Sequence, residues 1–170
     1  MQIFSYMNRF IVSFSFIFIS FSLIAEPTLE EVVVSARKVD ESVQDVPIAM
    51  SVFTASDIND AGIERPEDFI ALTPNVVMAN TVNVGDTLVT IRGLTSTRDA
   101  ESNFAFVVDG VLQTNPNAFN RELLDIAQIE VLKGPQGALY GRNATSGAIL
   151  ITTKAPSDEP ESSAVVGMGI

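Results

Sequence analysis

Two cationic side chains stand where a charge is unusual, each at the end of an apolar run and directly before a glycine. Arg92 follows the run that ends at Ile91, and Lys133 follows the run that ends at Leu132. A charge at the end of a buried strand must reach either water or a partner carboxylate. Spacing alone leaves both alternatives open, because a long side chain can also extend to solvent from a buried stem.

Two residue types that many enzymes use for catalysis are missing. The 170 residues include no Cys and no His, which excludes disulfide frameworks, thiolate zinc sites and the Ser-His-Asp arrangement. The glycine-rich stretch 134–147 lacks a phosphate loop, because Gly141 is followed by Arg142 and Asn143 instead of Lys and a hydroxyl residue. We therefore expect no cofactor, and an exported enzyme is a minor alternative.

One acidic stretch superficially suggests a calcium loop. It begins at Asp57, but Ala61 stands where an oxygen ligand is needed, and the twelfth position is Asp68 in place of Glu. A helix with acids on its solvated face is the favoured interpretation.

Composition indicates a folded, acidic protein. Apolar residues make up 46% of the chain and charged residues 18%, so a packed core is expected. Acids outnumber bases by 21 to 10, giving a net charge of −11, which argues against non-specific binding of nucleic acid.

The first 25 residues have the pattern of a cleaved export signal. Arg9 supplies a positive charge, residues 10–24 are apolar or serine, and Ala25 follows. A membrane anchor is the alternative, but a spanning helix takes about 20 apolar residues. The mature protein is therefore expected to function outside the cytoplasm.

Residues 26–45 are expected to form a flexible arm. Its centre holds three adjacent valines, Val32 to Val34, which favour extended backbone and are flanked by charged residues. We predict an exposed extended segment, followed by a polar linker at Asp40–Gln44. The alternative is an edge strand of the domain itself.

The next part of the chain predicts strands and two short helices. A strand at Val46–Phe53 is followed by Thr54 and Asp57, which have the spacing of a capping box. The helix that they open should end at Gly62. Pro66 and the two acids after it open a second helix, which Pro74 stops.

The remaining signals are those of a mixed α+β domain. A hairpin turns at Asp109–Gly110, and the long apolar run Ala148–Thr153 predicts a central strand. Further expected elements are strands at Thr87–Arg92 and Gln128–Leu132 and a helical turn at Glu122–Ile126. Residues 157–163 are predicted to be a linker, and residues 164–170 the start of one further strand.

Several motifs stand together in one order along the chain. They are Glu31–Ala36, Val46–Ile48, Ile91–Gly93, Val108–Val111, Ile129–Gln136, Leu139–Ala144 and Gly147–Ile149 leading to Lys154. In this order they closely resemble the N-terminal part of TonB-dependent outer-membrane receptors. The resemblance covers about residues 29–156.

The resemblance implies a role for each segment. Residues 46–156 would be the plug, a small domain with a mixed sheet and short helices that sits inside a β-barrel. Glu31, Val32, Val33, Val34, Ser35 and Ala36 would be the TonB box, which pairs as an added strand with TonB. Arg92 and Lys133 would face carboxylates on the barrel wall.

The resemblance also implies a function, namely energised uptake of a scarce nutrient, such as an iron complex, across the outer membrane. Plug loops facing outward would contact this ligand, and the candidates are Thr95, Ser96, Arg98, Asn115 and Asn117. The residues after the plug are too few for a barrel, so we expect a truncated or fragmentary receptor. The alternative is a stand-alone periplasmic plug that binds ligand or TonB without transport.

Overall fold

The computed structural model describes residues 31–35, 38–80, 87–97 and 101–156. The chain divides after Glu31, and the elements below all belong to the second part, Val32–Ile170. The expected signal peptide (1–25), linker (157–163) and final strand (164–170) lie outside the described residues, as do Ala36 and Arg98. Within the described ranges, no helix is long and apolar enough to cross a membrane.

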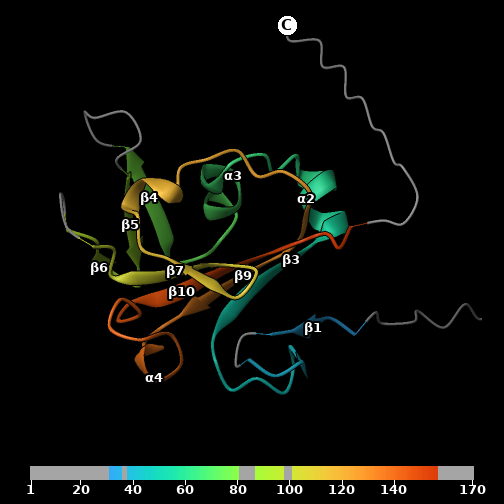
Figure 1. Ribbon diagram of the computed structural model, residues 1–170, viewed down its shortest axis with the longest axis horizontal. Helices are drawn as coiled ribbons and strands as arrows, with labels where there is room; N and C mark the ends of the chain where they lie inside the picture. Colours follow the sequence, from blue (N-terminus) through green and yellow to red (C-terminus); the bar gives the residue numbers. More distant parts are fainter. Residues whose placement is uncertain (1–30, 36–37, 81–86, 98–100, 157–170) are drawn as a thin grey trace, which may run out of the picture. The chain divides into compact units, whose positions relative to one another are not determined.

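A mixed five-stranded sheet forms the centre of the domain (Figure 1). β10 pairs in parallel with β7, whereas the other neighbouring strands run antiparallel. The predicted α+β class and the central position of the last apolar run are both confirmed. In spatial order the strands are β3 (Met50–Thr54), β9 (Ile126–Lys133), β10 (Gly147–Thr153), β7 (Phe104–Val108) and β8 (Val111–Gln113).

One face of this sheet carries an aromatic core. Alternate residues of β9, among them Ile129 and Val131, point into it because side chains alternate along a strand. Phe119 packs edge-on against Phe104 and Phe106, with ring centroids 5.2 and 5.1 Å apart. The elements over this face are α2 (Ala55–Ala61), α3 (Pro66–Ala71) and a small sheet of β4 (Val76–Asn80), β5 (Thr87–Ile91) and β6 (Leu94–Thr95).

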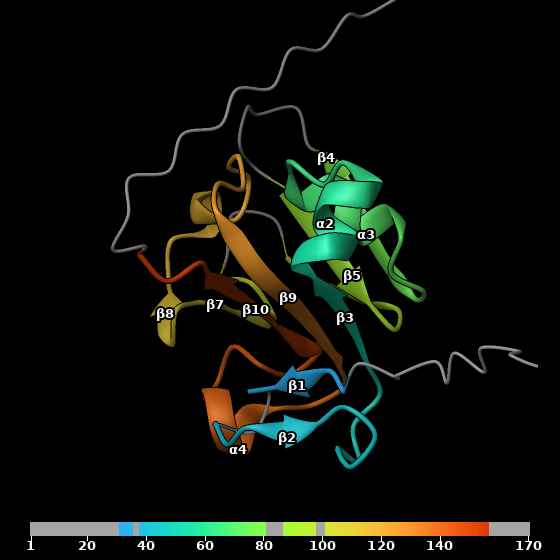
Figure 2. The same ribbon diagram turned by 90° about the vertical axis from the view of Figure 1, so that its right-hand side faces the viewer.

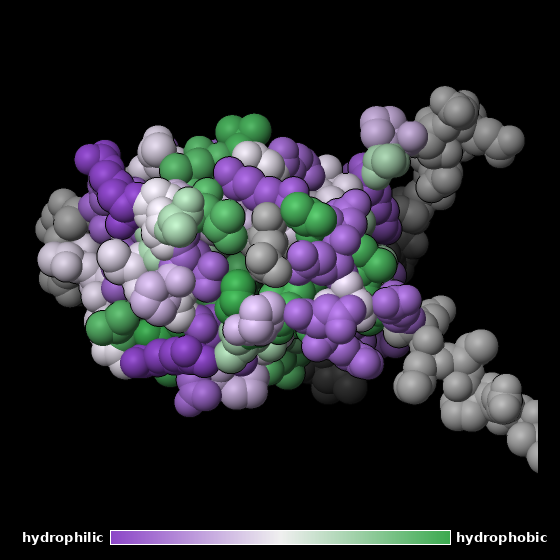
Figure 3. Space-filling model, turned by 90° about the horizontal axis from the view of Figure 1, so that it is seen from below, coloured by the Kyte–Doolittle hydropathy of each residue, from purple (hydrophilic) through white to green (hydrophobic). Residues whose placement is uncertain are grey.

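The opposite face is covered by the N-terminal segment and one short helix (Figure 2). Val34 and Val46 pack here with Leu132 and Leu150, so this layer of the core is apolar as well. The covering elements are β1 (Val33–Val34), β2 (Glu41–Ser42) and α4 (Gly137–Tyr140). On the surface seen from below in Figure 1, hydrophobic residues lie scattered among hydrophilic ones (Figure 3).

Two local predictions are confirmed in detail. The Thr54 hydroxyl accepts a hydrogen bond from the Asp57 amide, the Asp57 carboxylate accepts one from the Thr54 amide, and α2 ends at Gly62. In the hairpin, Asp109 and Gly110 have φ of 48° and 79°, the paired positive values of a type I′ turn.

Other boundaries differ from the predicted ones. β3 begins at Met50 instead of Val46, and β2 replaces the expected linker at Asp40–Gln44. The helical turn predicted at 122–126 is wrong, because Asp125 has a φ of 52° and Ile126 already belongs to β9. α4, β4, β6 and the 3₁₀ helix η1 (Pro116–Ala118) had not been expected.

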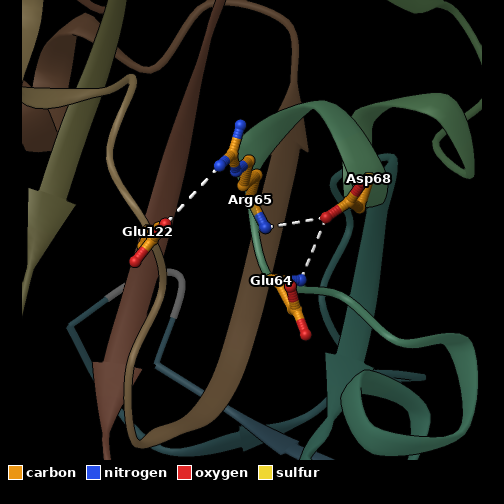
Figure 4. A network of polar contacts seen from close by, with 4 residues as sticks. All are labelled: Glu64, Arg65, Asp68 and Glu122. Carbon is orange, nitrogen blue, oxygen red and sulfur yellow. Dashed lines mark hydrogen bonds and ion pairs between the residues drawn. The ribbon is translucent and has the colours of Figure 1, made fainter. Parts of the chain in front are cut away.

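Polar contacts across the fold explain why residues 121–125 are not helical (Figure 4). The Leu123 amide donates to the Glu64 carbonyl at 2.8 Å, and Arg65 pairs with Glu122 at 3.5 Å. The Asp68 carboxylate accepts from the amides of Glu64 and Arg65, which fixes the start of α3. The segment is therefore held in a non-helical conformation by partners that lie far away in the sequence.

Candidate interaction sites

The valine segment, Val32–Ser35, is extended as predicted but is not an exposed arm. β1 pairs antiparallel with β2, and the Val43 amide donates to the Val32 carbonyl at 3.0 Å. Val34 is only 1% exposed, because it packs into the apolar layer on the sheet, whereas Val33 is 50% exposed. The expectation of exposure is therefore corrected for Val34, and the alternative of an edge strand packed on the domain describes the segment.

Side chains of β9 fix the valine segment at two points. The side-chain amide of Gln128 donates a hydrogen bond to the Val33 carbonyl at 2.9 Å. The Glu130 carboxylate accepts a hydrogen bond from the backbone amide of Ser35 at 3.0 Å. The Ser35 hydroxyl in turn donates to Asp40 at 2.8 Å. The backbone of the segment is thus held by side chains as well as by the β1–β2 pairing.

Glu130 is the most deeply buried acid in the described part of the chain. It is 2% exposed, and burial raises the pKa of its carboxyl group. The hydrogen bond from the Ser35 amide lowers this pKa, and the negative charge of Asp40 raises it. One carboxylate oxygen, Oε2, is buried without a hydrogen-bond partner among the described residues. An ionised Glu130 is therefore poorly accommodated here.

A groove of about 790 Å³ lies beside this contact. Its lining includes Lys38, Asp40, Leu112, Tyr140 and Leu150. Burial, followed by the charge of Glu130, raises the pKa of Tyr140 to about 12. The Lys38 ammonium lies 5.7 Å from the centre of the Tyr140 ring, within the range of a cation–π contact.

Arg92 and Lys133 come together at the ends of β5 and β9. A Cβ atom added at Gly134, the residue after Lys133, would lie 3.1 Å from Arg92 Nη1. Lys133 Nζ donates to the Ser51 hydroxyl at 3.0 Å. Burial, and secondly the charge of Arg92, lower the pKa of Lys133. Neither cation has a carboxylate partner among the described residues, so within that part of the chain the two form a positively charged corner.

The predicted ligand-facing residues differ in how accessible they are. Thr95 is exposed, and its hydroxyl accepts from Thr90 at 3.0 Å. Ser96 is 7% exposed, and its hydroxyl donates to Asn103 at 2.8 Å, so that group is already occupied inside the domain. Asn115 and Asn117 are exposed on the η1 loop, where the Asn117 amide donates to the Asn115 side chain.

Sequence reasoning did not select Gln128, Glu130 or Tyr140. A signal for Glu130 was present, because it is a single acid inside the apolar run Ile129–Leu132. An acid at that position requires a polar partner when the strand is buried on both faces. Nothing local indicated that its partner would be the backbone of Ser35, 95 residues away.

Comparison with known proteins identifies the family to which this domain belongs. Residues 42–148 match the family described as TonB-dependent Receptor Plug Domain. The pesticin receptor of Yersinia enterocolitica is 31% identical over 136 residues, which are 79% of this chain and 20% of that protein. The vitamin B12 transporter BtuB of Vibrio vulnificus is 32% identical over 149 residues, 84% of this chain and 23% of that protein.

A solved structure agrees with the sequence relatives. The ferric yersiniabactin uptake receptor FyuA from Yersinia pestis superposes with a TM-score of 0.60 at 30% identity, over 66% of this chain and 18% of that one. The chain thus spans about a fifth of the length of the relatives that it matches. With the mixed sheet, the short helices and the match over residues 42–148 in agreement, this chain belongs to the TonB-dependent receptor plug domain family.

Proposed function

We propose that this chain is the plug portion of an outer-membrane receptor that takes up a scarce nutrient with energy delivered by TonB. The observation that carries the proposal is the valine segment, an extended strand that precedes a plug domain and forms main-chain hydrogen bonds through Val32 and Val33. A short extended segment of this kind can add to the edge of another sheet. No catalytic role is part of this proposal.

TonB would pair with residues 31–36, the proposed TonB box. Val33 already presents an exposed side chain, but Val34 and the Ser35 amide are engaged with the domain. Pairing along the whole box therefore requires the segment to leave β2 and β9. The backbone conformation that a strand partner needs is already present at Val33–Val34.

Replacing Val33 by Pro tests this assignment. Proline removes a backbone donor and restricts its neighbours, so we expect Val33→Pro to abolish binding of the TonB C-terminal domain, measured by calorimetry. Val33→Ala is the matched control, because it keeps the amide, and it should retain binding. Unchanged affinity of the proline variant would overturn the assignment of the TonB box.

Arg92 and Lys133 are proposed to face carboxylates of a surrounding barrel wall. Their support is the positively charged corner described above, where burial and like charge together lower the pKa of Lys133. An acid placed opposite would relieve this repulsion and favour the charged form of Lys133. The two residues would then fix the plug in its wall.

The proposed nutrient is an iron complex, with Thr95, Asn115 and Asn117 as accessible ligand-facing groups. The name of the FyuA receptor includes ferric yersiniabactin, whereas that of BtuB includes vitamin B12. The occupied hydroxyl of Ser96 makes it a weaker candidate, and Arg98 lies outside the described residues.

A stand-alone periplasmic plug that binds ligand or TonB without transport is the second candidate function. The intact mass of the native protein in outer-membrane and periplasmic fractions separates the two. A species in the outer membrane several times heavier than 18.3 kDa supports the receptor. A periplasmic species of about 16 kDa, the mass left after signal removal, supports the alternative and excludes transport by this chain alone.

A further inference from the structure

The contact between Glu130 and the valine segment has an unusual feature, because a carboxyl group lies in an otherwise apolar layer. Its neighbours across the sheet are Val52 on β3 and Leu150 on β10. Val34 belongs to the same layer and is fully buried. The next residue, Ser35, donates its backbone amide to the carboxyl group of Glu130. Glu130 therefore stays out of water only while the segment remains docked.

We propose that Glu130 is a proton-sensitive latch, a positioning residue whose uncharged carboxyl group holds the valine segment on β9 and whose ionisation favours release of the segment. The latch itself is a property of the chain alone. Only its consequence, that release makes the segment available to TonB, rests on the proposed function.

The two carboxylate oxygens give the physical reason. Oε1 accepts from the Ser35 amide and, at 3.3 Å, from the Gln128 side chain, and it can do so in either protonation state. Oε2 is buried without a partner, so a negative charge shared between the two oxygens is only half compensated. When the segment leaves, water reaches this position and the charge is solvated.

The direction of the pH dependence follows from these states. Burial raises the pKa of Glu130 in the docked form, whereas a released, solvated carboxyl group has an ordinary pKa. The docked form thus binds the proton more tightly. Docking is strongest below the ordinary pKa of a glutamate and weakens as the pH rises through the docked pKa of Glu130, by at most about tenfold per pH unit.

Other charged or titratable groups of the described residues lie around this site. Asp40, in the loop before β2, raises the pKa of Glu130, so it moves the transition to higher pH without creating it. Burial, followed by the charge of Glu130, raises the pKa of Tyr140 on α4 to about 12, so the hydroxyl of Tyr140 stays protonated at neutral pH. Lys38 lies over the Tyr140 ring. No other charged side chain on β3 or β10 pairs directly with Glu130.

A spin label reports docking without any partner. The chain contains no Cys, so Val33→Cys provides a single attachment site whose side chain is half exposed in the docked form. With the full chain, we expect the ratio of mobile to immobile signal to rise by at least about threefold between about pH 4.5 and pH 7.5. In the Glu130→Gln background the segment should stay immobile throughout.

Two further variants test whether the pH-dependent release arises from Glu130. Asp40→Asn should shift the transition to lower pH and reduce its amplitude, because one cause of the raised pKa of Glu130 is removed. Asp60→Asn, an exposed acid on α2, is the matched control and should leave the profile unchanged. A profile that is flat in the parent chain, or equally steep in the Glu130→Gln background, would overturn the latch.

Unlabelled chains that keep Val33 separate the latch from the proposed function, because a label at Val33 would lie inside the proposed TonB box. At about pH 7.5, Glu130→Gln should bind the TonB C-terminal domain several-fold more weakly than the parent chain, because docking competes with binding. If the spin-label profile has the expected form but TonB binds neither chain, the latch holds and the proposed partner is wrong. If TonB binds and the profile is flat, only the latch is wrong.

Discussion

Arg92 and Lys133 illustrate how single charges acquire meaning from their surroundings. In the sequence each could have reached either water or a carboxylate. In the structure Arg92 is exposed, Lys133 is half-buried with its ammonium group on Ser51, and the two are close enough for one to lower the pKa of the other. Their proximity, which no local pattern encodes, is the new information.

Replacing Arg92 by Gln should raise the pKa of Lys133. The charge of Arg92 is the second cause of the lowered value, so its removal leaves burial as the remaining one. The pKa can be followed by NMR of the lysine Cε and Nζ nuclei. Arg142→Gln is the control, because that exposed residue pairs with Glu101 and should leave Lys133 unchanged. An unaltered titration in Arg92→Gln would contradict the proximity of the two cations.

Gly147 occupies a position that no larger residue fits. A Cβ atom there would clash with the Leu132 carbonyl and approach Ile91 Cδ1 to 3.1 Å. Gly147→Ala should lower the free energy of unfolding by about 1–3 kcal/mol, the usual cost of overpacking. Urea denaturation measures the change. Gly137→Ala is the matched control, because nothing lies within 4 Å of its Cβ, and its stability should be unchanged or higher.

At the scale of elements, α2 is fixed by its first turn. Thr54→Ala should reduce the free energy of unfolding by about 1 kcal/mol, because one amide loses its cap. The same change should raise the pKa of Asp57, since the hydrogen bond from the Thr54 side chain is the main cause of its lowered value. Urea denaturation and carboxyl NMR titration check the two effects. Asn59→Ala, exposed in the same helix, should show neither.

Elements set by neighbouring residues could be predicted from the sequence, whereas those set by distant contacts could not. The capping box of α2 and the Asp109–Gly110 turn depend on residues within a few positions, and both were predicted. The stretch at 122–126 is held by Glu64 and Arg65, so its local helical pattern was misleading. β1 is docked by side chains of β9 for the same reason.

The candidate sites divide in the same way. The order of the motifs was enough to indicate the family, which the match over residues 42–148 confirms. It also selected Arg92, Lys133 and the valines as candidate site residues, and their roles stay predictions. The burial of Val34 and of the Ser96 hydroxyl depends on what covers them, and a sequence pattern does not specify that cover. The contact of Glu130 with the Ser35 amide can be recognised only when the positions of both β9 and the valine segment are known.

At the scale of the whole domain, the two faces of the five-stranded sheet perform different tasks. One face is closed by helices and by five interacting phenylalanines, including Phe53 and Phe69. The other is closed by the valine segment and α4, with polar groups at the contact. The second face is therefore the one on which we expect a covering element to detach while the aromatic core stays intact.

The position of β10 at the centre of the sheet affects how fast this domain folds. In the described sheet β3 pairs with β9, so that contacts such as Lys133 with Ser51 close a loop of 82 residues. β10 then joins the β3–β9 pair to the β7–β8 hairpin. Such non-local pairing gives a high contact order, for which refolding takes milliseconds to seconds. We expect stopped-flow refolding on that scale, and microsecond folding would contradict it. If the chain is exported through a translocation channel, as the sequence predicts, β10 can join the sheet only after residue 153 has emerged, so we expect the sheet to stay incomplete during export.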